Sequence, residues 1–416
     1  MSKRNKIKSI NNIHFRNISI IIIISMLTTV FVYFATPTIF HSFIDRWDYQ
    51  VYFNTLIKPF VTNGNLPYID YNWEYPILML APVIISALPV ILFKSQIWFF
   101  IIFPCLMIIC NLVTTVCVYY ISYNIYLSTK RAFIAAFLFA TAFSTVYFVI
   151  TKYDAFPTCL LMMGLAITIC GKEHLKKYGY VSILFGFFAK IYPIAALPFF
   201  ILFNSKTTSL KQEIISALKI AIPASIILAL PILILNPGSV SVYLLKTEMD
   251  KSYYVNTLTY TIYSWVSGVF RINIGLDIIS ICIYIVSGLI IISLLYFAYT
   301  RPEKDSTMLL KYTLCILFAI VMCSKFKSPQ YMMWFVPILC IFASDSLYNI
   351  GLFYMTQILA FLEFPILWGS LYTNNSYTSG EYMALIFFTI EFAVWVFLIY
   401  KIVYLDDRNV IKQTRH

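Results

Sequence analysis

Long apolar runs separated by short polar segments fill the chain from residue 18 to residue 404. The runs consist mainly of Ile, Leu and Phe without strict alternation, and a helix needs roughly 20 such residues to cross a bilayer. This pattern predicts an all-α, polytopic integral membrane protein with about 12 transmembrane helices. Because no polar segment is long enough for a separate soluble domain, residues 1–416 are expected to form one membrane domain.

The polar segments predict how the helices are oriented. The terminal segments 1–17 and 405–416 are charged and are expected on the cytoplasmic side. The first helix then delivers the segment 41–75 to the outside, and a second long external segment is expected at 236–273. The basic residues Lys130 and Arg131 are expected in the cytoplasm, whereas the segment 41–75 is expected outside. The chain would therefore cross the membrane an odd number of times within 76–123, although two apolar runs lie there. One of these runs is therefore expected to be a partial helix.

The apolar run Tyr178–Phe203 is interrupted by 190-KIYP-193 and flanked by basic segments on both sides. A single crossing would leave one basic segment outside, against the usual bias. Two half-helices that meet at Lys190 are therefore expected, and such broken helices commonly line sites within membranes. An ammonium within an apolar run is costly and usually marks a function, although Lys190 could instead extend to the membrane surface.

Composition and charge narrow the classes of function. The chain is 61% hydrophobic and 12% charged, with a net charge of +12. In a soluble protein this charge would suggest a nucleic-acid partner, but here Lys and Arg lie in short segments between spans, so no nucleic acid is expected. The nine cysteines form no C-x-x-C pair and the four histidines form no cluster, which predicts buried thiols rather than metal ligands.

Four polar features are expected to meet on the external side of the membrane. They are the segment 41–75, the turn 151-TKYD-154, the break at Lys190 and the turn 325–331. The segment 41–75 carries Asp45, Arg46, Asp48 and Glu74 among many aromatic residues. Such a segment outside the first span is either a binding surface or an active site, and we interpret it as an active site.

Four stretches of the chain carry a family resemblance. They are 48-DYQVYF-53 with 64-GNLPYIDYNWEYP-76, 152-KYDAFP-157, 183-ILFGFFAKIYPIAALPFFIL-202 and 328-SPQYMMWFVP-337. They resemble the acidic first loop, the basic-plus-aspartate turn, the glycine-rich half-helix and the S-P-Q-Y turn of GT-C glycosyltransferases that use polyprenyl-phosphate sugars. Within that superfamily the chain is most similar to glycosyltransferase family 87, the DUF2029-like mannosyltransferases.

The chain departs from this pattern in the first loop. The second proline that follows Y-P in the family is Ile77 here. No adjacent acidic pair is present, since Asp45 and Asp48 stand three positions apart, and this leaves the need for a divalent cation open. No other cofactor is expected, because a sugar on a lipid phosphate is already activated and the chain has no G-x-x-x-x-G-K-[ST] motif.

The resemblance implies a GT-C fold whose external first loop forms the active-site cavity. It implies transfer of a hexose, mannose first, from a polyprenyl- or dolichyl-phosphate carrier to an acceptor hydroxyl outside the cytoplasm, with inversion at the sugar. The acceptor would be a glycolipid, a glycan or a protein, and membrane lipids would surround the enzyme. A carboxylate would accept the proton of the acceptor hydroxyl, while cationic and amide groups would hold the leaving phosphate.

Asp48 is the expected base because it leads the stretch that resembles the family, and Asp45 is the alternative. The expected donor-phosphate or substrate-binding residues are Lys190, Lys327, Gln330, Tyr331, Asp154, Glu74 and Arg46, and no metal ligand is assigned. Structural roles stay open for two of the acids. Asp48 could pair with Arg46 or cap a helix that starts near Tyr49, and Asp154 could cap the helix that follows it.

Two rival functions handle similar substrates or share the membrane location. One is a flippase or polymerase of lipid-linked glycans, and the other is a small-solute transporter. A transporter is expected to have paired charges within its spans and repeated halves, and apart from Lys190, Glu363 and Glu391 the apolar runs offer few charges. The Ile-, Lys- and Asn-rich usage favours a prokaryotic source, and hence the plasma membrane with the active site facing outside.

Overall fold

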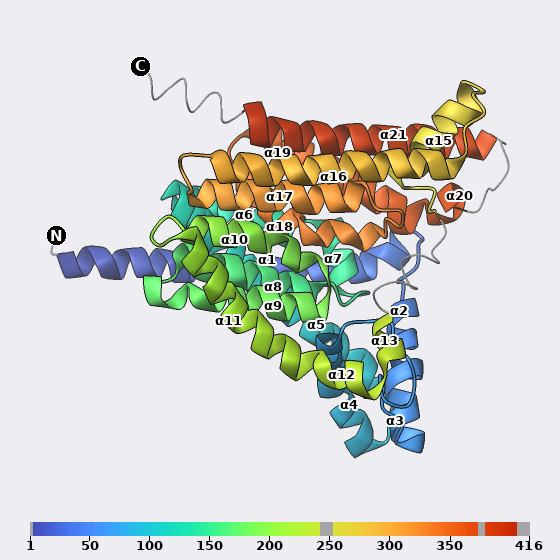
Figure 1. The fold of residues 1–416 in the computed structure, drawn as a ribbon, viewed down its shortest axis with the longest axis horizontal. Helices are drawn as coiled ribbons and strands as arrows, with labels where there is room; N and C mark the ends of the chain where they lie inside the picture. The colour runs from blue at the N-terminus through green and yellow to red at the C-terminus, as the bar shows by residue number, and fades with distance from the viewer. Residues whose placement is uncertain (1–2, 242–252, 373–378, 406–416) are drawn as a thin grey trace.

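The computed structural model describes residues 3–241, 253–372 and 379–405. Within these ranges the chain is helical and contains no strand, apart from one isolated bridge between Pro67 and Tyr71. The longer helices run side by side along the long axis of the molecule (Figure 1). The all-α class is therefore confirmed. Most of the expected C-terminal tail, and residues 242–252 of the second external segment, lie outside the described residues.

The α-helices are α1 (Lys3–Thr38), α2 (Trp47–Tyr52), α3 (Lys58–Asn63), α4 (Leu80–Phe93), α5 (Ile97–Tyr126), α6 (Thr129–Ala140), α7 (Phe143–Val149), α8 (Ala155–Cys170), α9 (Lys177–Ala189), α10 (Leu197–Asn204), α11 (Leu210–Leu228), α12 (Leu230–Leu235), α13 (Pro237–Ser241), α15 (Leu258–Tyr263), α16 (Leu276–Thr300), α17 (Ser306–Met322), α18 (Val336–Ala343), α19 (Leu347–Phe361), α20 (Trp368–Tyr372) and α21 (Ser379–Tyr400). Short 3-10 or π-helical turns are η1 (Phe53–Ile57), η2 (Ile77–Met79), η3 (Glu173–Leu175), η4 (Tyr192–Ala196), η6 (Ser264–Val269), η7 (Pro329–Trp334), η8 (Leu362–Ile366) and η9 (Lys401–Leu405).

Several helices have the length and composition of membrane spans. In the described part of the chain there are five: Asn12–Thr38, Ile97–Tyr126, Leu276–Thr300, Leu347–Ile366 and Tyr382–Tyr404. A sixth results if α6 and α7, which meet at 58°, count as one bent span. These helices indicate an integral membrane protein. The expected count of about 12 spans is not confirmed, because several apolar runs fold as short or bent pieces.

Two local expectations agree with the structure. The segment 76–123 contains one helix of span length, α5, and one shorter apolar helix, Ile77–Phe93. The break at Lys190 is also present, since α9 ends just before it, Lys190 is extended with φ −162° and ψ 143°, and η4 and α10 follow. Gly186 permits this geometry, because a Cβ at that position would lie 3.0 Å from Cβ of Pro193.

Small residues bring α8 and α9 together as an antiparallel pair, with α5 on another side of α8. A Cβ added to Gly179 of α9 would lie 3.2 Å from the carbonyl oxygen of Gly164 on α8 and 2.0 Å from Oγ1 of Thr168. Only glycine fits so close a backbone approach. Because the pair is antiparallel, the start of α8 and the end of α9 lie next to each other.

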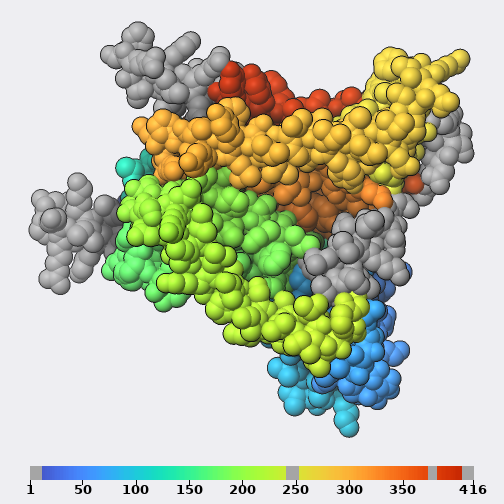
Figure 2. All heavy atoms as spheres, in the orientation of Figure 1, coloured from blue at the N-terminus to red at the C-terminus, as the bar shows by residue number. Residues whose placement is uncertain are grey.

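One end of the molecule is broader than the other. Figure 1 shows α2, α3, α4, α12 and α13 in a lobe at this end, and the space-filling view shows the blue and yellow-green segments of this lobe projecting from the bundle (Figure 2). The C-terminal end of α1 and the turn between α7 and α8 also reach the broad end (Figure 1). Polar segments that connect the helices therefore gather there.

Candidate active site

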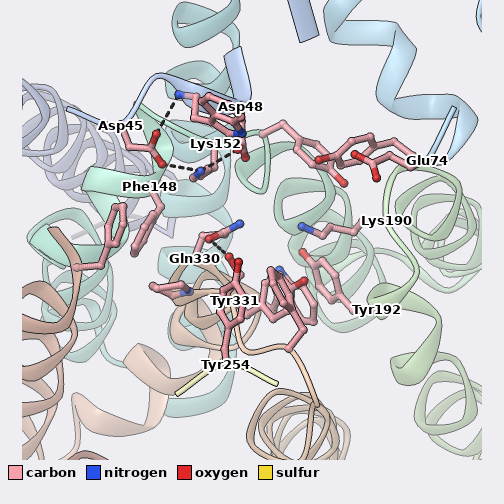
Figure 3. Close-up of a pocket in the computed structure, with 18 of the residues that line it drawn as sticks. Asp45, Asp48, Glu74, Phe148, Lys152, Lys190, Tyr192, Tyr254, Gln330 and Tyr331 are labelled. Atoms are coloured by element: carbon pink, nitrogen blue, oxygen red, sulfur yellow. Dashed lines mark hydrogen bonds and ion pairs between the residues drawn. The ribbon is translucent and has the colours of Figure 1, made fainter. Parts of the chain in front are cut away.

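A polar pocket of about 560 Å³ lies where these connecting segments meet. The four features expected to converge all contribute to its wall (Figure 3). Its charged and polar lining residues are Asp45, Asp48, Glu74, Lys152, Lys190, Ser328 and Gln330, and its aromatic ones include Trp47, Tyr153, Tyr192, Tyr254, Tyr331 and Trp334. Charged and polar side chains from segments up to 285 positions apart (residues 45 to 330) thus face one space.

One wall of the pocket holds two carboxylates on a single ammonium. Nζ of Lys152 lies 2.8 Å from Oδ2 of Asp45 and 3.0 Å from Oδ1 of Asp48. The exposed fraction of the side chain is 15% for Asp45, 19% for Asp48 and 8% for Lys152. Lys152 was not among the residues expected at the site, although it belongs to the K-Y-D turn that carries part of the family resemblance. The alternative in which Asp48 pairs with Arg46 is not observed, because Asp48 pairs with Lys152 instead.

The backbone before α2 is fixed to α7 by one tyrosine. The hydroxyl of Tyr147 accepts a hydrogen bond from the amide of Asp45 at 3.0 Å and donates one to the carbonyl of Phe43 at 2.9 Å. The amide of Trp47 in turn donates to Oδ1 of Asp45 at 2.9 Å. Asp48 lies inside the first turn of α2, which begins at Trp47, so it does not cap a helix starting near Tyr49.

The two carboxylates differ in how their oxygens are occupied. Both oxygens of Asp45 are engaged, one by Trp47 and one by Lys152. In the described part of the chain Oδ2 of Asp48 has only a long contact, 3.5 Å from the hydroxyl of Tyr52. Asp48 therefore has the oxygen that a further proton donor can reach, which favours it over Asp45 as a base.

Burial and the neighbouring charges have opposite effects on the pKa values of Asp48 and Lys152. Burial is the largest influence on Asp48 and raises the pKa of its carboxyl, and the nearby Lys152 opposes this without cancelling it. For Lys152, burial lowers the pKa of the ammonium, but Asp48 and Asp45 raise it by more, so its pKa lies above the usual value. Lys152 therefore keeps its charge near neutral pH, while Asp48 is a stronger proton acceptor than an ordinary aspartate.

Another part of the pocket lining presents a second ammonium. Nζ of Lys190 lies 2.6 Å from Oδ1 of Asp154, which also accepts a hydrogen bond from Nε1 of Trp334 at 2.7 Å. Asp154 is the residue before α8, but its side chain makes no capping hydrogen bond, so the alternative of a capping role is replaced by this ion pair. Figure 3 shows Lys190 pointing into the pocket rather than toward the membrane surface.

Aromatic rings surround the ammonium of Lys190. It lies 4.8 Å, 5.1 Å and 5.3 Å from the ring centres of Tyr153, Tyr331 and Trp334. Trp334 is stacked between Tyr331 and Tyr192, with centre distances of 4.2 Å on each side. Cation–π contacts and the ion pair hold the ammonium in place while 16% of the Lys190 side chain stays exposed to the pocket.

The remaining expected residues divide into two groups. Glu74, Gln330 and Tyr331 line the pocket. Arg46 and Lys327 are not among its lining residues: the guanidinium of Arg46 donates to the hydroxyl of Tyr33 at 2.8 Å, and Lys327 is buried.

Lys327 belongs to a buried ionic cluster behind the pocket. Its Nζ lies 3.0 Å from Oε2 of Glu391 and 3.8 Å from Oε2 of Glu363. Oε1 of Glu363 accepts hydrogen bonds from Asn256 at 2.6 Å and from Tyr372 at 2.8 Å. The sequence indicated Lys327 as a cation outside the membrane, but only the packing of distant helices shows which way its side chain points.

The described residues contain no group of three or more His, Cys, Asp or Glu side chains able to hold a metal ion. Two of the three carboxylates that line the pocket, Asp45 and Asp48, already share the ammonium of Lys152. What the arrangement offers chemically is a carboxylate base on one wall and a held cation on the other.

The fold and pocket define an integral membrane protein of the all-α class with a polar site at one end of its helices. No family model matches the sequence, and no curated protein matches it. Among solved structures, the chain is similar to the apo oligosaccharyltransferase of Archaeoglobus fulgidus, with TM-score 0.48 and 11% identity over 94% of this chain and 55% of that one.

Two further structures of the oligosaccharyltransferase from the same organism are similar. The complex with an inhibitory peptide and a dolichol-phosphate gives TM-score 0.43 and 12% identity, over 94% of this chain and 55% of that one. The form tethered to an acceptor peptide gives TM-score 0.46 and 12% identity, over 94% and 54%. The chain thus spans about half the length of these proteins.

Proposed function

We propose that this protein is a GT-C glycosyltransferase. It transfers a hexose, with mannose as the first candidate, from a polyprenyl- or dolichyl-phosphate carrier to an acceptor hydroxyl outside the cytoplasm. One observation carries the proposal: Asp48, with one oxygen that makes only a long hydrogen bond, and Lys190, whose side chain is partly exposed, line the same pocket (Figure 3). The pocket volume of about 560 Å³ lies within the roughly 300–1,000 Å³ typical of small-molecule sites.

The reaction requires one proton transfer and one displacement. Asp48 accepts the proton of the acceptor hydroxyl as its oxygen attacks the anomeric carbon, and a new C–O bond forms there. The bond from that carbon to the phosphate oxygen breaks, and the electron pair leaves with the lipid phosphate. Attack from the face opposite the leaving phosphate inverts the configuration of the sugar.

The groups on the second wall suit the leaving phosphate. Negative charge accumulates on it during the displacement, and a fixed cation stabilises charge that develops in a site largely shielded from water. Lys190 supplies this cation, and Asp154 holds it in place. Gln330 and Tyr331 also line the pocket and add polar groups for phosphate or sugar hydroxyls, and Glu74 is an exposed lining residue.

Transfer by the purified protein tests the proposal. The protein, in detergent or liposomes, is given radiolabelled polyprenyl-phosphate sugars and a crude lipid extract as acceptor. Asp48→Asn is expected to lower transfer by about 10²- to 10⁴-fold, because it removes the base. Asp70→Asn is the matched control. Asp70 lies outside the pocket lining, where its Oδ2 accepts a 2.6 Å hydrogen bond from the amide of Leu66 that an asparagine can also accept.

Normal transfer by Asp48→Asn would exclude Asp48 as the base. Absence of transfer from every donor, with the protein folded, would favour transport, a second function suggested by the buried Lys327, Glu363 and Glu391. Charges buried within membrane helices often mark transport pathways. These three side chains do not line the pocket, however, so the pocket itself favours the transferase.

A further inference from the structure

The carboxylates of Asp45 and Asp48 are arranged as in a cation site. They come from one short segment, and each directs one oxygen toward the same point. Divalent cations such as Ca²⁺ and Mg²⁺ bind to carboxylate oxygens placed in this way. The point on which the two oxygens converge is therefore the position where a divalent cation would have to lie.

That position is taken by Nζ of Lys152. Its distances of 2.8 Å and 3.0 Å to the two carboxylates are those of charge-assisted hydrogen bonds rather than of a distant ion pair. The side chain is only 8% exposed, so it is not free to move into solvent. The ammonium is thus an integral part of the acidic wall.

The backbone around Lys152 explains why it reaches this point. Lys152 lies in the turn after α7, where its amide donates to the carbonyl of Phe148 at 2.8 Å. Tyr147, five positions earlier and within α7, binds the backbone of Phe43 and Asp45. The end of α7 therefore holds the acidic segment at two places, its backbone through Tyr147 and its carboxylates through Lys152.

The charge balance differs from that of a metal site. Two carboxylates and one ammonium leave one net negative charge, whereas two carboxylates and one divalent cation leave none. A divalent cation would also attract electron density from both carboxylates and weaken them as proton acceptors. The ammonium orders the two acids while leaving Asp48 able to accept a proton.

We infer that Lys152 substitutes for a divalent cation, positions Asp45 and Asp48, and makes this site independent of metal. The catalytic consequence rests on the proposed glycosyl transfer, but the consequence for metal binding does not. Lys152 is a positioning residue, since it acts through the two carboxylates.

Metal binding tests the inference without any substrate. Purified full-length protein in detergent is titrated with Mn²⁺, and free Mn²⁺ is followed by electron paramagnetic resonance. The wild type is expected to show no binding that depends on Asp48. Lys152→Met, whose side chain is similar in length but uncharged, is expected to gain one Mn²⁺ site. This site is expected to be lost again in Lys152→Met/Asp48→Asn.

Lys190→Met is the matched control, because it removes a pocket ammonium that is paired with one carboxylate instead of two. It is expected to gain no Mn²⁺ site. Thermal unfolding shows whether each variant is folded. If Lys152→Met is not folded, Lys152→Gln replaces it. The inference is wrong if the wild type binds Mn²⁺ in a way that Asp48→Asn abolishes. It is also wrong if neither folded Lys152 variant gains a site.

Transfer assays add a second measurement. Wild-type transfer is expected to be unchanged by a chelator, while Lys152→Met is expected to lose about 10- to 100-fold and to recover partly with Mn²⁺. Chelator-sensitive wild-type transfer would overturn the inference but leave the proposed transferase intact. Absence of transfer from any donor would overturn the proposed function, while the Mn²⁺ titration would still decide the role of Lys152.

Discussion

The proton affinity of Asp48 reflects two opposing influences. Burial raises the pKa of its carboxyl, and the ammonium of Lys152 lowers it by less. A buried acid without a cation would be protonated near neutral pH and useless as a base, whereas an exposed aspartate would be a weak proton acceptor. The pairing with Lys152 places Asp48 between these limits.

This balance predicts the pH dependence of transfer. Only the carboxylate form of Asp48 accepts a proton, so activity is expected to fall as the pH drops through its pKa. Because that pKa is raised from 3.8, this fall in activity, the acidic limb of the pH profile, is expected at a higher pH than for an ordinary aspartate base. Lys152→Met removes an influence that lowers the pKa and is expected to move the limb to higher pH.

The measurement is kcat/KM against pH for wild type and Lys152→Met, since this ratio reports the free enzyme. Asp70→Asn, outside the pocket lining, serves as the control and is expected to leave the limb in place. A limb that moves to lower pH in Lys152→Met would contradict the role given to the ammonium.

The buried ionic cluster of Lys327, Glu363 and Glu391 connects elements that are distant in sequence. Glu363 lies in η8 and Glu391 in α21, while Lys327 directly precedes the segment that lines the pocket. Asn256 donates to both Glu363 and the backbone carbonyl of Lys327, at 2.6 Å and 2.8 Å. The cluster therefore fixes the pocket wall formed by Ser328 to Tyr331 from behind.

Lys327→Met is expected to destabilise the protein by about 3–5 kcal/mol, because it leaves two buried carboxylates without their cation. Unfolding in detergent by a denaturant measures this change. Lys325→Met is the matched control: it removes a charge from the same segment, but that side chain is not buried, and the loss is expected to be within about 0.5 kcal/mol.

Adding Glu391→Gln to Lys327→Met is expected to restore part of the stability, since it removes one of the two stranded charges. If Lys327→Met were as stable as the Lys325→Met control, the cluster would not be the anchor of this wall.

For the molecule as a whole, the ends of the helices predict its orientation. α1 begins and α21 ends at the same, narrower end, while α2 and α3 lie at the broad end with the pocket (Figure 1). If the basic N-terminal segment lies in the cytoplasm, the broad end faces outside. The connection between α16 and α17 lies at the narrower end and would then face the cytoplasm (Figure 1).

Thiol labelling in intact cells tests this orientation. Asn63→Cys at the end of α3 is expected to react with a membrane-impermeant thiol reagent. Glu303→Cys, between α16 and α17, is expected to react only after the cells are opened. Both positions are exposed, and the unmodified protein, with its nine cysteines, gives the background. The reverse pattern of labelling would place the pocket in the cytoplasm.

Features that depend on neighbouring residues could be predicted from the sequence. Apolar runs of membrane-spanning length without alternation indicate helices, so the all-α class followed from the pattern. Lys190, with Pro193 shortly after it, indicated a helix break because a charge and a missing backbone donor both oppose a continuous apolar helix. The number of spans was less predictable, since hydropathy does not show where an apolar run bends or stays short.

The pairing of the charged side chains could not be predicted from the sequence, because it depends on how the helices pack. Lys152 binds Asp45 and Asp48 from about a hundred positions away, and Lys327 binds Glu391 instead of facing the pocket. The physical reason is that an ion pair depends on distance in space, and a side chain in a loop can turn either way until packing fixes it. The sequence therefore specified the helices and the polar residues between them, while the packing of the helices selected the partners.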